Sequence, residues 1–304
     1  MADVLARPVD HLAPRGTSQP LEDVTLGPGG NGLNTAIALA RLGVSVRVAA
    51  AVGNDRFGHL IRDRLRAEGI ESEGLVTLPD AKTSTSIVLV EATGERRFLH
   101  LRGVSAFFSG QNLNWEEVKG CRIFHYASAF AIPAFDETSL APALKRAHEL
   151  GCVTSMNICW DVRGRWLRTI QPALAHTDVI FPNVDEGREL TGESEPPMIA
   201  ARLREWGVKT VVIKLGAAGC YVESPQGSFL SPGYAVQVVD TTGAGDCFAA
   251  GFLGAICRDP SLEHAARYAN AAGALACLGL GAADSAPTLA QLEEFLRKHS
   301  APAR

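Results

Sequence analysis

The chain has 304 residues, of which 46% are hydrophobic and 20% are charged, and its net charge is −4. This length suffices for a full hydrophobic core and fits one large α/β domain with an appendage better than two equal domains. A nucleic-acid binder or a protein of anionic membrane surfaces carries a basic excess, so neither partner is expected.

The cysteines and the N-terminus bear on the cellular compartment. Seven cysteines occur without a Cys-x-x-Cys pair, and several lie in apolar runs: Cys121, Cys152, Cys159, Cys220, Cys247, Cys257 and Cys277. They are typical of small buried side chains in a reducing compartment rather than of disulfides or a zinc site. No signal segment opens the chain and no apolar run reaches spanning length, so we expect a cytoplasmic protein.

The first third of the chain mixes helical and strand patterns. Apolar residues at helical spacing over 33–40 predict a helix, and alternation over 44–48 predicts a strand. A second helix is predicted from about residue 55 to 68. Residues 85–90 and 95–101 flank the sequence Glu-Ala-Thr-Gly and predict a hairpin, which we interpret as an insertion that could serve as a lid.

The rest of the chain follows a regular alternation of strands and helices. Short apolar strands are predicted at 123–126, 152–156, 179–181 and 211–213, with helical stretches between them. Such alternation indicates βαβ units in a mostly parallel, doubly wound sheet. Long alanine-rich helices are predicted at about 261–278 and 288–298.

The most informative segment is Asp240-Thr241-Thr242-Gly243-Ala244-Gly245-Asp246. We predict a strand at 235–238 before it and a helix after it, so Gly243, Ala244 and Gly245 would lie at a helix N-terminus. Free backbone N–H groups and the helix dipole favour an anion such as phosphate there.

Asp246 follows directly in the first helical turn. A carboxylate does not help to bind phosphate, but it can accept a hydroxyl proton while the anion hole holds a transferring phosphoryl group. For an isolated Gly-x-Gly-Asp, a helix cap after a tight turn is the simpler interpretation. The full seven-residue string favours the catalytic one.

This string resembles the C-terminal signature of the PfkB, or ribokinase-like, carbohydrate kinases. The family's N-terminal signature is matched by Gly29-Gly30-Asn31-Gly32-Leu33-Asn34-Thr35-Ala36. The resemblance implies a three-layer α/β/α fold with a small β-sheet lid, ATP as phosphoryl donor and Mg²⁺ as counter-charge. It places the core at 27–79 and 103–304 and the lid at 4–26 and 80–102, and it implies a homodimer formed through the lid.

The resemblance also assigns roles to single residues around the transferred phosphoryl group. Asp246 matches the catalytic base, and the anion hole is matched by Gly243, Ala244 and Gly245. The residues that match positions binding the sugar-like acceptor are Asp3, Gly29, Gly30 and Asn34. Without the family, Asn34 would be interpreted as a satisfied buried amide.

The nucleotide and cation positions are assigned in the same way. The residues matched on the nucleotide side are Asn183, Lys214, Gly216, Gly219 and Asn270. Glu186 matches a Mg²⁺ position that acts through water. Asp240 and the carbonyl of Thr242 match ligands of a monovalent cation, often potassium. Asn183 can also be a helix cap, and Gly216 and Gly219 can be simple turn residues.

The sequence departs from the family pattern near the expected acceptor site. Family chains open with a buried strand before the residue that Asp3 matches, so we expect the first core strand to be missing from this chain. The usual Gly-Ala-Asn reads Gly103-Val104-Ser105, and position 157, often Asp in relatives, is Asn157. The aromatic candidates to line this site, with core or lid packing as the alternative, are Phe98, His100, Phe107 and Phe108.

The main hypothesis is therefore ATP-dependent phosphorylation of a hydroxyl on a sugar or sugar-like molecule. A nucleoside kinase on the same scaffold and a non-catalytic sugar or nucleotide sensor remain alternatives. A sugar-acid acceptor would need a basic partner, for which Arg102 and Arg163 are candidates. A P-loop NTPase is excluded because no Gly-Lys-Ser/Thr occurs in the sequence.

Overall fold

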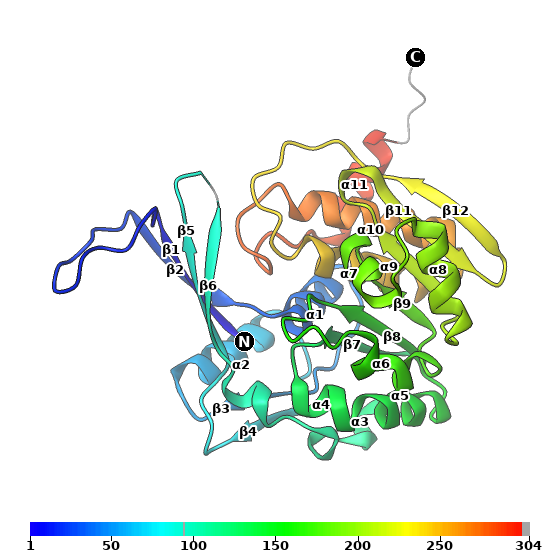
Figure 1. Cartoon of the computed structure of the whole chain (residues 1–304), viewed down its shortest axis with the longest axis horizontal. Coiled ribbons are helices and arrows are strands. Elements are labelled where there is room, and N and C mark those ends of the chain that lie inside the picture. Colours follow the sequence, from blue (N-terminus) through cyan, green and yellow to red (C-terminus); the bar gives the residue numbers. More distant parts are fainter. Residues whose placement is uncertain (94, 300–304) are drawn as a thin grey trace.

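The computed structural model describes residues 1–93 and 95–299, and a six-stranded sheet runs through its centre (Figure 1). The strands lie in the order β12 (Gly227–Pro232), β11 (Gly219–Ser224), β10 (Thr210–Lys214), β9 (Val179–Phe181), β8 (Val153–Ile158) and β7 (Ile123–Ala129). Strands β7 to β10 are parallel, whereas β11 and β12 are added as an antiparallel hairpin. The predicted mostly parallel sheet and its four predicted strands are confirmed.

One face of this sheet is covered by the helices that connect its parallel strands. Met156, Ile180 and Ile213 point to this face and join one apolar cluster with the helices. The helices that contribute to this cluster are α4 (Pro133–Thr138), α5 (Leu140–Glu149), α6 (Leu167–Leu174), α7 (Val184–Thr191) and α8 (Pro196–Glu205). The short helix α3 (Trp115–Val118) packs at the rim.

The other face carries the helices from the two ends of the chain. Val179, Phe181 and Val212 alternate along their strands with Ile180 and Ile213, so they point to this second face and pack against Phe248 and Phe252. The helices of this layer are α9 (Ala244–Ile256), α10 (Leu262–Ala276), α1 (Asn31–Arg41) and α11 (Leu289–His299). The result is the predicted three-layer α/β/α fold.

A second sheet of four strands stands apart on one side of the core (Figure 1). Its strand order is β2 (Asp23–Pro28), β1 (Ala2–Arg7), β5 (Thr85–Val90) and β6 (Arg96–Leu101). We call it the lid sheet. It contains the predicted hairpin as β5 and β6. Helix α2 (Arg56–Ala67), also predicted, precedes this hairpin in the chain. Strands β3 (Ala50–Gly53) and β4 (Leu75–Leu78) form a separate parallel pair.

The N-terminal residues bear on the expectation of a missing core strand. Residues Ala2–Arg7 pair with β2 and β5 in the lid sheet, and β7 is an edge of the six-stranded sheet. Within residues 1–93 and 95–299, no N-terminal strand therefore joins the central sheet. The boundaries given above for core and lid stay a prediction. Gly94 of the predicted turn and residues 300–304 of the predicted core lie outside the described residues.

Two predicted strands are wrong. Residues 44–48 form only an isolated bridge between Arg47 and Glu71, and the regular ladder begins at Ala50, beyond a turn in the partner segment. Residues 235–238 pair with no strand after β12 ends at Pro232, and Val238 is exposed. In both segments the apolar pattern is that of a strand, but the described residues form no regular ladder there: the segment around Glu71 lies beside 46–48 and gives only the bridge, and no strand pairs with 235–238.

The packing of α9 on α10 depends on a close approach at Gly251. A Cβ at this position would lie 2.8 Å from the carbonyl oxygen of Tyr268 and 2.9 Å from the Cβ of Ala272. A larger side chain would push α10 away from the helix that carries Asp246. Alanine has a higher helix propensity than glycine, so at position 251 packing and helix propensity have opposite effects on stability.

We predict that Gly251→Ala lowers the free energy of unfolding by about 1–3 kcal/mol, because overpacking outweighs the gain in propensity. Urea denaturation measures this change. The matched control is Gly32→Ala in α1, where a new Cβ meets its nearest neighbour, Ala127, at 4.0 Å, and there we expect no loss. Equal stability of the two variants would contradict the role given to Gly251.

Candidate active site

Asp246 is placed by the turn that begins α9. Gly243 caps the helix with φ of 76°, a left-handed conformation that favours glycine. A Cβ on Gly243 would also lie 2.7 Å from the Cα of Ala282. The turn is thus pressed against the segment that follows α10, and the Asp246 side chain enters the protein with only 7% of its surface exposed.

Four elements converge on the Asp246 carboxylate. Asn34 of α1 donates to Oδ2 from Nδ2 at 2.9 Å, and Asn157 of β8 donates to Oδ1 at 3.4 Å. Lys214, at the end of β10, donates from Nζ to the Oδ1 of Asn157 at 2.9 Å. An ammonium group only donates and a carboxylate only accepts, so the two partners fix the orientation of the Asn157 amide.

The surroundings of Asp246 change its acidity. Burial raises the pKa of Asp246 to about 7, against the opposing effects of the Asn34 hydrogen bond and the Lys214 charge, and the nearby Glu186 raises it further. A carboxylate with this pKa is substantially ionised at neutral pH and still binds a proton readily. This balance suits a general base.

Of the predicted acceptor residues, Asp3 lies against Gly29, and Asn34 follows in α1 with its backbone N–H donating to the carbonyl oxygen of Gly30 at 3.0 Å. The Asp3 carboxylate reaches from β1 so close to Gly29 that a Cβ there would lie 1.9 Å from Oδ2. Within the described residues, Oδ1 of Asp3 and Oδ1 of Asn34 are buried without a hydrogen-bond partner. Buried acceptors nearly always have a hydrogen-bond donor, so these two oxygens are suited to a ligand that donates from hydroxyl groups. Gly30 begins α1 beside Met1.

The predicted aromatic residues separate into two groups. Register places His100 opposite Ser86 and Ser86 opposite Asp3, so His100 and Asp3 share a face of the lid sheet. Phe98 lies two residues from His100 on the same face, and the two rings stack at 5.8 Å. Phe108 instead packs on Phe135 in the core, and Phe107 is largely exposed.

On the nucleotide side, the structure shows local roles for the predicted residues. Asn183 and Glu186 form a reciprocal capping box at the start of α7, with hydrogen bonds of 2.8 and 2.7 Å. Gly216 and Gly219 shape the turn between β10 and β11. The Asn270 amide donates to Ser231 and Pro232 and holds the end of β12.

Asp240, a predicted cation ligand, is fully engaged by protein groups. It accepts hydrogen bonds from the backbone N–H groups of Thr242 at 2.8 Å and Gly281 at 3.0 Å, and it forms an ion pair with Arg96 of β6. Sequence reasoning missed Arg96 because nothing in the local sequence connects positions 96 and 240. It also missed that Lys214 reaches the network around Asp246.

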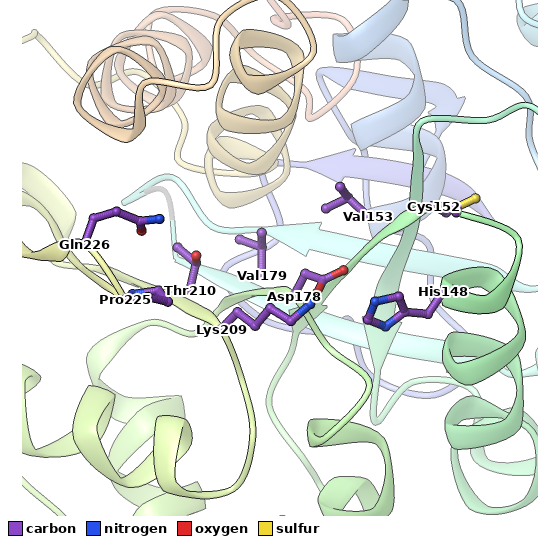
Figure 2. Close-up of a pocket in the computed structure, with 10 residues that line it drawn as sticks. His148, Cys152, Val153, Asp178, Val179, Lys209, Thr210, Pro225 and Gln226 are labelled. Carbon is purple, nitrogen blue, oxygen red and sulfur yellow. Dashed lines mark ion pairs between the residues drawn. The ribbon is translucent and has the colours of Figure 1, made fainter.

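A separate hollow of about 540 Å³ lies at the amino ends of the parallel strands, at the end of the central sheet away from Asp246 (Figure 2). Its lining includes the first residues of β8, β9 and β10, namely Val153, Val179 and Thr210, and the ion pair of Lys209 with Asp178 at 2.7 Å. Asn157 and Lys214 instead stand at or next to the carboxyl ends of their strands. The hollow is therefore not part of the site around Asp246.

Residues 1–93 and 95–299 contain no group of three or more His, Cys, Asp or Glu side chains that could hold a metal ion. No helix in this part of the chain combines the length and the apolar character needed to cross a membrane.

These features define a ribokinase-like α/β protein, with a lid sheet over a carboxylate at a helix N-terminus. The family model described as pfkB family carbohydrate kinase matches residues 1–289. The chain therefore belongs to the pfkB family of carbohydrate kinases and is a sugar kinase.

Individual relatives agree with this assignment. A probable fructokinase-5 of Arabidopsis thaliana is 31% identical, with 90% of this chain and 89% of that protein covered. An ATP-dependent ribose-1-phosphate kinase of Halopiger xanaduensis is 34% identical, with 88% and 86% covered. The solved structure of a putative ribokinase II from E. coli in complex with ATP and Mg²⁺ superposes with a TM-score of 0.84 at 26% identity, covering 98% of this chain and 96% of that one.

We predict that Asn157→Asp shifts the acidic limb of the pH–rate profile to higher pH by about one unit or more. The new carboxylate would neutralise Lys214 and repel the ionised Asp246, so the pKa of the base would rise and activity would be lost at a higher pH as the pH falls. The kcat/KM profile between pH 5 and 9 measures the shift. Asn114→Asp, at the cap of α3, is the matched control, and an unmoved limb in Asn157→Asp would refute the coupling.

Proposed function

We propose that the chain transfers the γ-phosphoryl group of ATP to a hydroxyl of a neutral sugar, with Asp246 as the general base. The observation that carries this proposal is the buried Asp246 carboxylate, held by Asn34 directly behind the Gly243 turn. A carboxylate that only capped the helix would not need a pKa near 7, hydrogen bonds from two other elements, or a lysine held beside it through Asn157.

The proposed reaction is an in-line displacement. The sugar hydroxyl, oriented by Asp3 and Asn34, gives its proton to Asp246 while its oxygen attacks the γ-phosphorus and the bond to ADP breaks. The backbone N–H groups of Gly243, Ala244, Gly245 and Asp246 stabilise the charge that develops on the phosphoryl oxygens. The lid sheet excludes water, which would otherwise compete as acceptor.

The positive charge that balances the phosphate groups is proposed to come from Lys214 and from Mg²⁺. Lys214 lies beside the turn, with its Nζ 3.6 Å from where a Cβ of Gly245 would stand. Mg²⁺ would neutralise the phosphates, held through water by Asn183 and Glu186. Glu186 fits this task because it is a buried carboxylate next to Lys214 and burial raises its pKa, so a nearby cation would stabilise its charged form. In the proposed complex, Gly216 and Gly219 shape the nucleotide loop and Asn270 supports it.

The acceptor is proposed to be a neutral sugar because its binding residues are acceptors for hydroxyl donors. Asp3 and Asn34 each offer a buried oxygen, whereas an acidic sugar would need a cation. Arg163, one candidate for that cation, is paired with Glu137 at 3.3 Å. Relatives named as fructokinases make ketohexoses the first acceptors to test, and the relative named as a ribose-1-phosphate kinase makes that anionic sugar phosphate the acceptor whose use would contradict the proposal of a neutral sugar.

The lid sheet is proposed to form a homodimer through its outer face. Leu26, Ile87 and Leu99 stand in one row across the sheet, on the face opposite to Asp3, and all three are exposed. An exposed apolar row on a sheet favours association with another protein surface. A cytoplasmic location is proposed from the seven cysteines, which are free thiols in the structure.

We predict that Asp246→Asn reduces kcat by roughly 10²–10⁴-fold and leaves ATP binding largely intact, because the variant loses its proton acceptor and keeps the anion hole. ADP release with Mg-ATP and a panel of hexoses, pentoses, sugar acids and nucleosides measures the rate. Asp63→Asn on the exposed face of α2 is the matched control. Near-normal turnover of Asp246→Asn would refute the base assignment, and sugar binding by wild type without ADP release would favour a sensor.

We predict that Leu99→Glu converts a dimer into monomers, because the glutamate buries a charge in the proposed apolar interface. Light scattering after size-exclusion chromatography measures the mass. Leu230→Glu, which changes another exposed leucine on β12, serves as the control that keeps the wild-type mass. A monomeric wild-type protein, or a dimeric Leu99→Glu variant, would contradict the lid interface.

A further inference from the structure

An ion pair joins the start of β6 in the lid sheet to the proposed phosphate-binding turn. Arg96 is the first residue of β6 and its guanidinium contacts Oδ1 of Asp240, 144 positions away in sequence. The Asp240 side chain is 4% exposed and the Arg96 side chain 24% exposed. Figure 1 shows strands β5 and β6 beside the segment that follows α10, in agreement with the contacts of Arg96 and Gly281 with the same carboxylate.

Asp240 organises the turn that leads to Asp246. One carboxylate oxygen accepts from the Thr242 N–H at 2.8 Å, and the other accepts from the Gly281 N–H at 3.0 Å. Gly281 precedes Ala282, the residue pressed against Gly243. The charge on Asp240 therefore fixes both the turn and the segment that backs it, and its position bears directly on the backbone N–H groups proposed to hold the phosphoryl group.

A buried carboxylate needs a compensating positive charge. The partners of the Asp240 carboxylate are the backbone N–H groups of Thr242 and Gly281 and the guanidinium of Arg96. Among these partners only Arg96 carries a full charge. A monovalent cation on the same carboxylate would stand next to the guanidinium and be repelled by it. The residues present therefore do not fit the monovalent-cation site that the family resemblance implies.

We propose that Arg96 supplies, from the lid, the positive charge that a monovalent cation would supply at Asp240, so that this kinase works without potassium. Arg96 is a positioning residue: it acts on the phosphoryl group through Asp240 and the turn from Thr242 to Gly245. Because the charge arrives on the lid hairpin, the phosphate-binding turn is completed only when the lid lies over the site. This inference rests on the proposed phosphoryl transfer at that turn.

The hairpin itself offers a matched control. Arg97 is the next residue along β6, so its side chain points to the opposite face of the sheet, where it pairs with Glu91 at 2.6 Å. Arg96→Ala and Arg97→Ala remove the same side chain from adjacent positions of one strand. Only the first removes charge from Asp240.

The test measures ADP release in potassium chloride and in tetramethylammonium chloride at equal ionic strength, with the acceptor that gives the highest wild-type rate. We expect the wild-type and Arg97→Ala rates to be equal in the two salts within about twofold. Arg96→Ala should lose roughly 10²-fold in kcat without potassium, the size expected when one partner of a buried charge pair is removed. Potassium should restore much of that rate with saturation, and Arg96→Lys should stay independent of potassium.

Potassium activation of the wild type to the same degree as Arg96→Ala would overturn the proposal, as would a loss in Arg96→Ala that no monovalent cation restores. Thermal unfolding provides a readout that needs no acceptor. Potassium should raise the Tm of Arg96→Ala and leave that of the wild type unchanged; the same Tm shift in both proteins would overturn the proposal even if no sugar is phosphorylated. If no acceptor stimulates ADP release but potassium raises only the Tm of Arg96→Ala, the proposed function is rejected. The proposal that Arg96 replaces a monovalent cation at Asp240 is then still supported.

Discussion

The burial of the Asp246 carboxylate is the constraint on which the rest of the structure depends. Removing an ionised group from water is costly unless nearby groups donate hydrogen bonds or supply opposite charge. Here the donors come from α1 and β8, and the opposite charge comes from the end of β10, while α9 carries the carboxylate itself. These elements must meet at one point, so the order of β8, β9 and β10 and the packing of α1 on α9 are requirements of the site.

The same reasoning explains why the lid sheet has two different faces. Alternation along β1, β5 and β6 places Asp3, His100 and Arg96 on one face and Leu26, Ile87 and Leu99 on the other. The first face approaches the core, where Asp240 compensates Arg96. The inner face thus combines the polar groups of Asp3, His100 and Arg96 with the ring of Phe98, whereas the outer face carries an exposed apolar row.

Local patterns in the sequence predict much of this site, and contacts between distant residues account for what they miss. The turn from Asp240 to Asp246 is a continuous segment, so its glycine positions and its helix can be predicted together. The bridging of Lys214 to Asp246 by Asn157 joins three segments, and the ion pair of Arg96 with Asp240 joins residues 144 positions apart, so neither leaves a local pattern. The wrong strands at 44–48 and 235–238 have the same origin, because a strand requires a partner that its own sequence does not specify.

Asn183 and Glu186 show that a structural and a chemical interpretation of one motif can both hold. Their capping box uses one carboxylate oxygen of Glu186 and the side-chain oxygen of Asn183, and it thereby fixes the rotamers of both side chains. The second oxygen of the Glu186 carboxylate can still accept a hydrogen bond from a hydrated cation, whereas the Asn183 amide nitrogen can only donate, as it could to a phosphate oxygen. Because their conformations are already set, binding a cation would cost less side-chain entropy than it would on flexible residues. The capping box at the start of α7 is therefore a reason to expect a prepared ligand position, and it does not argue against one.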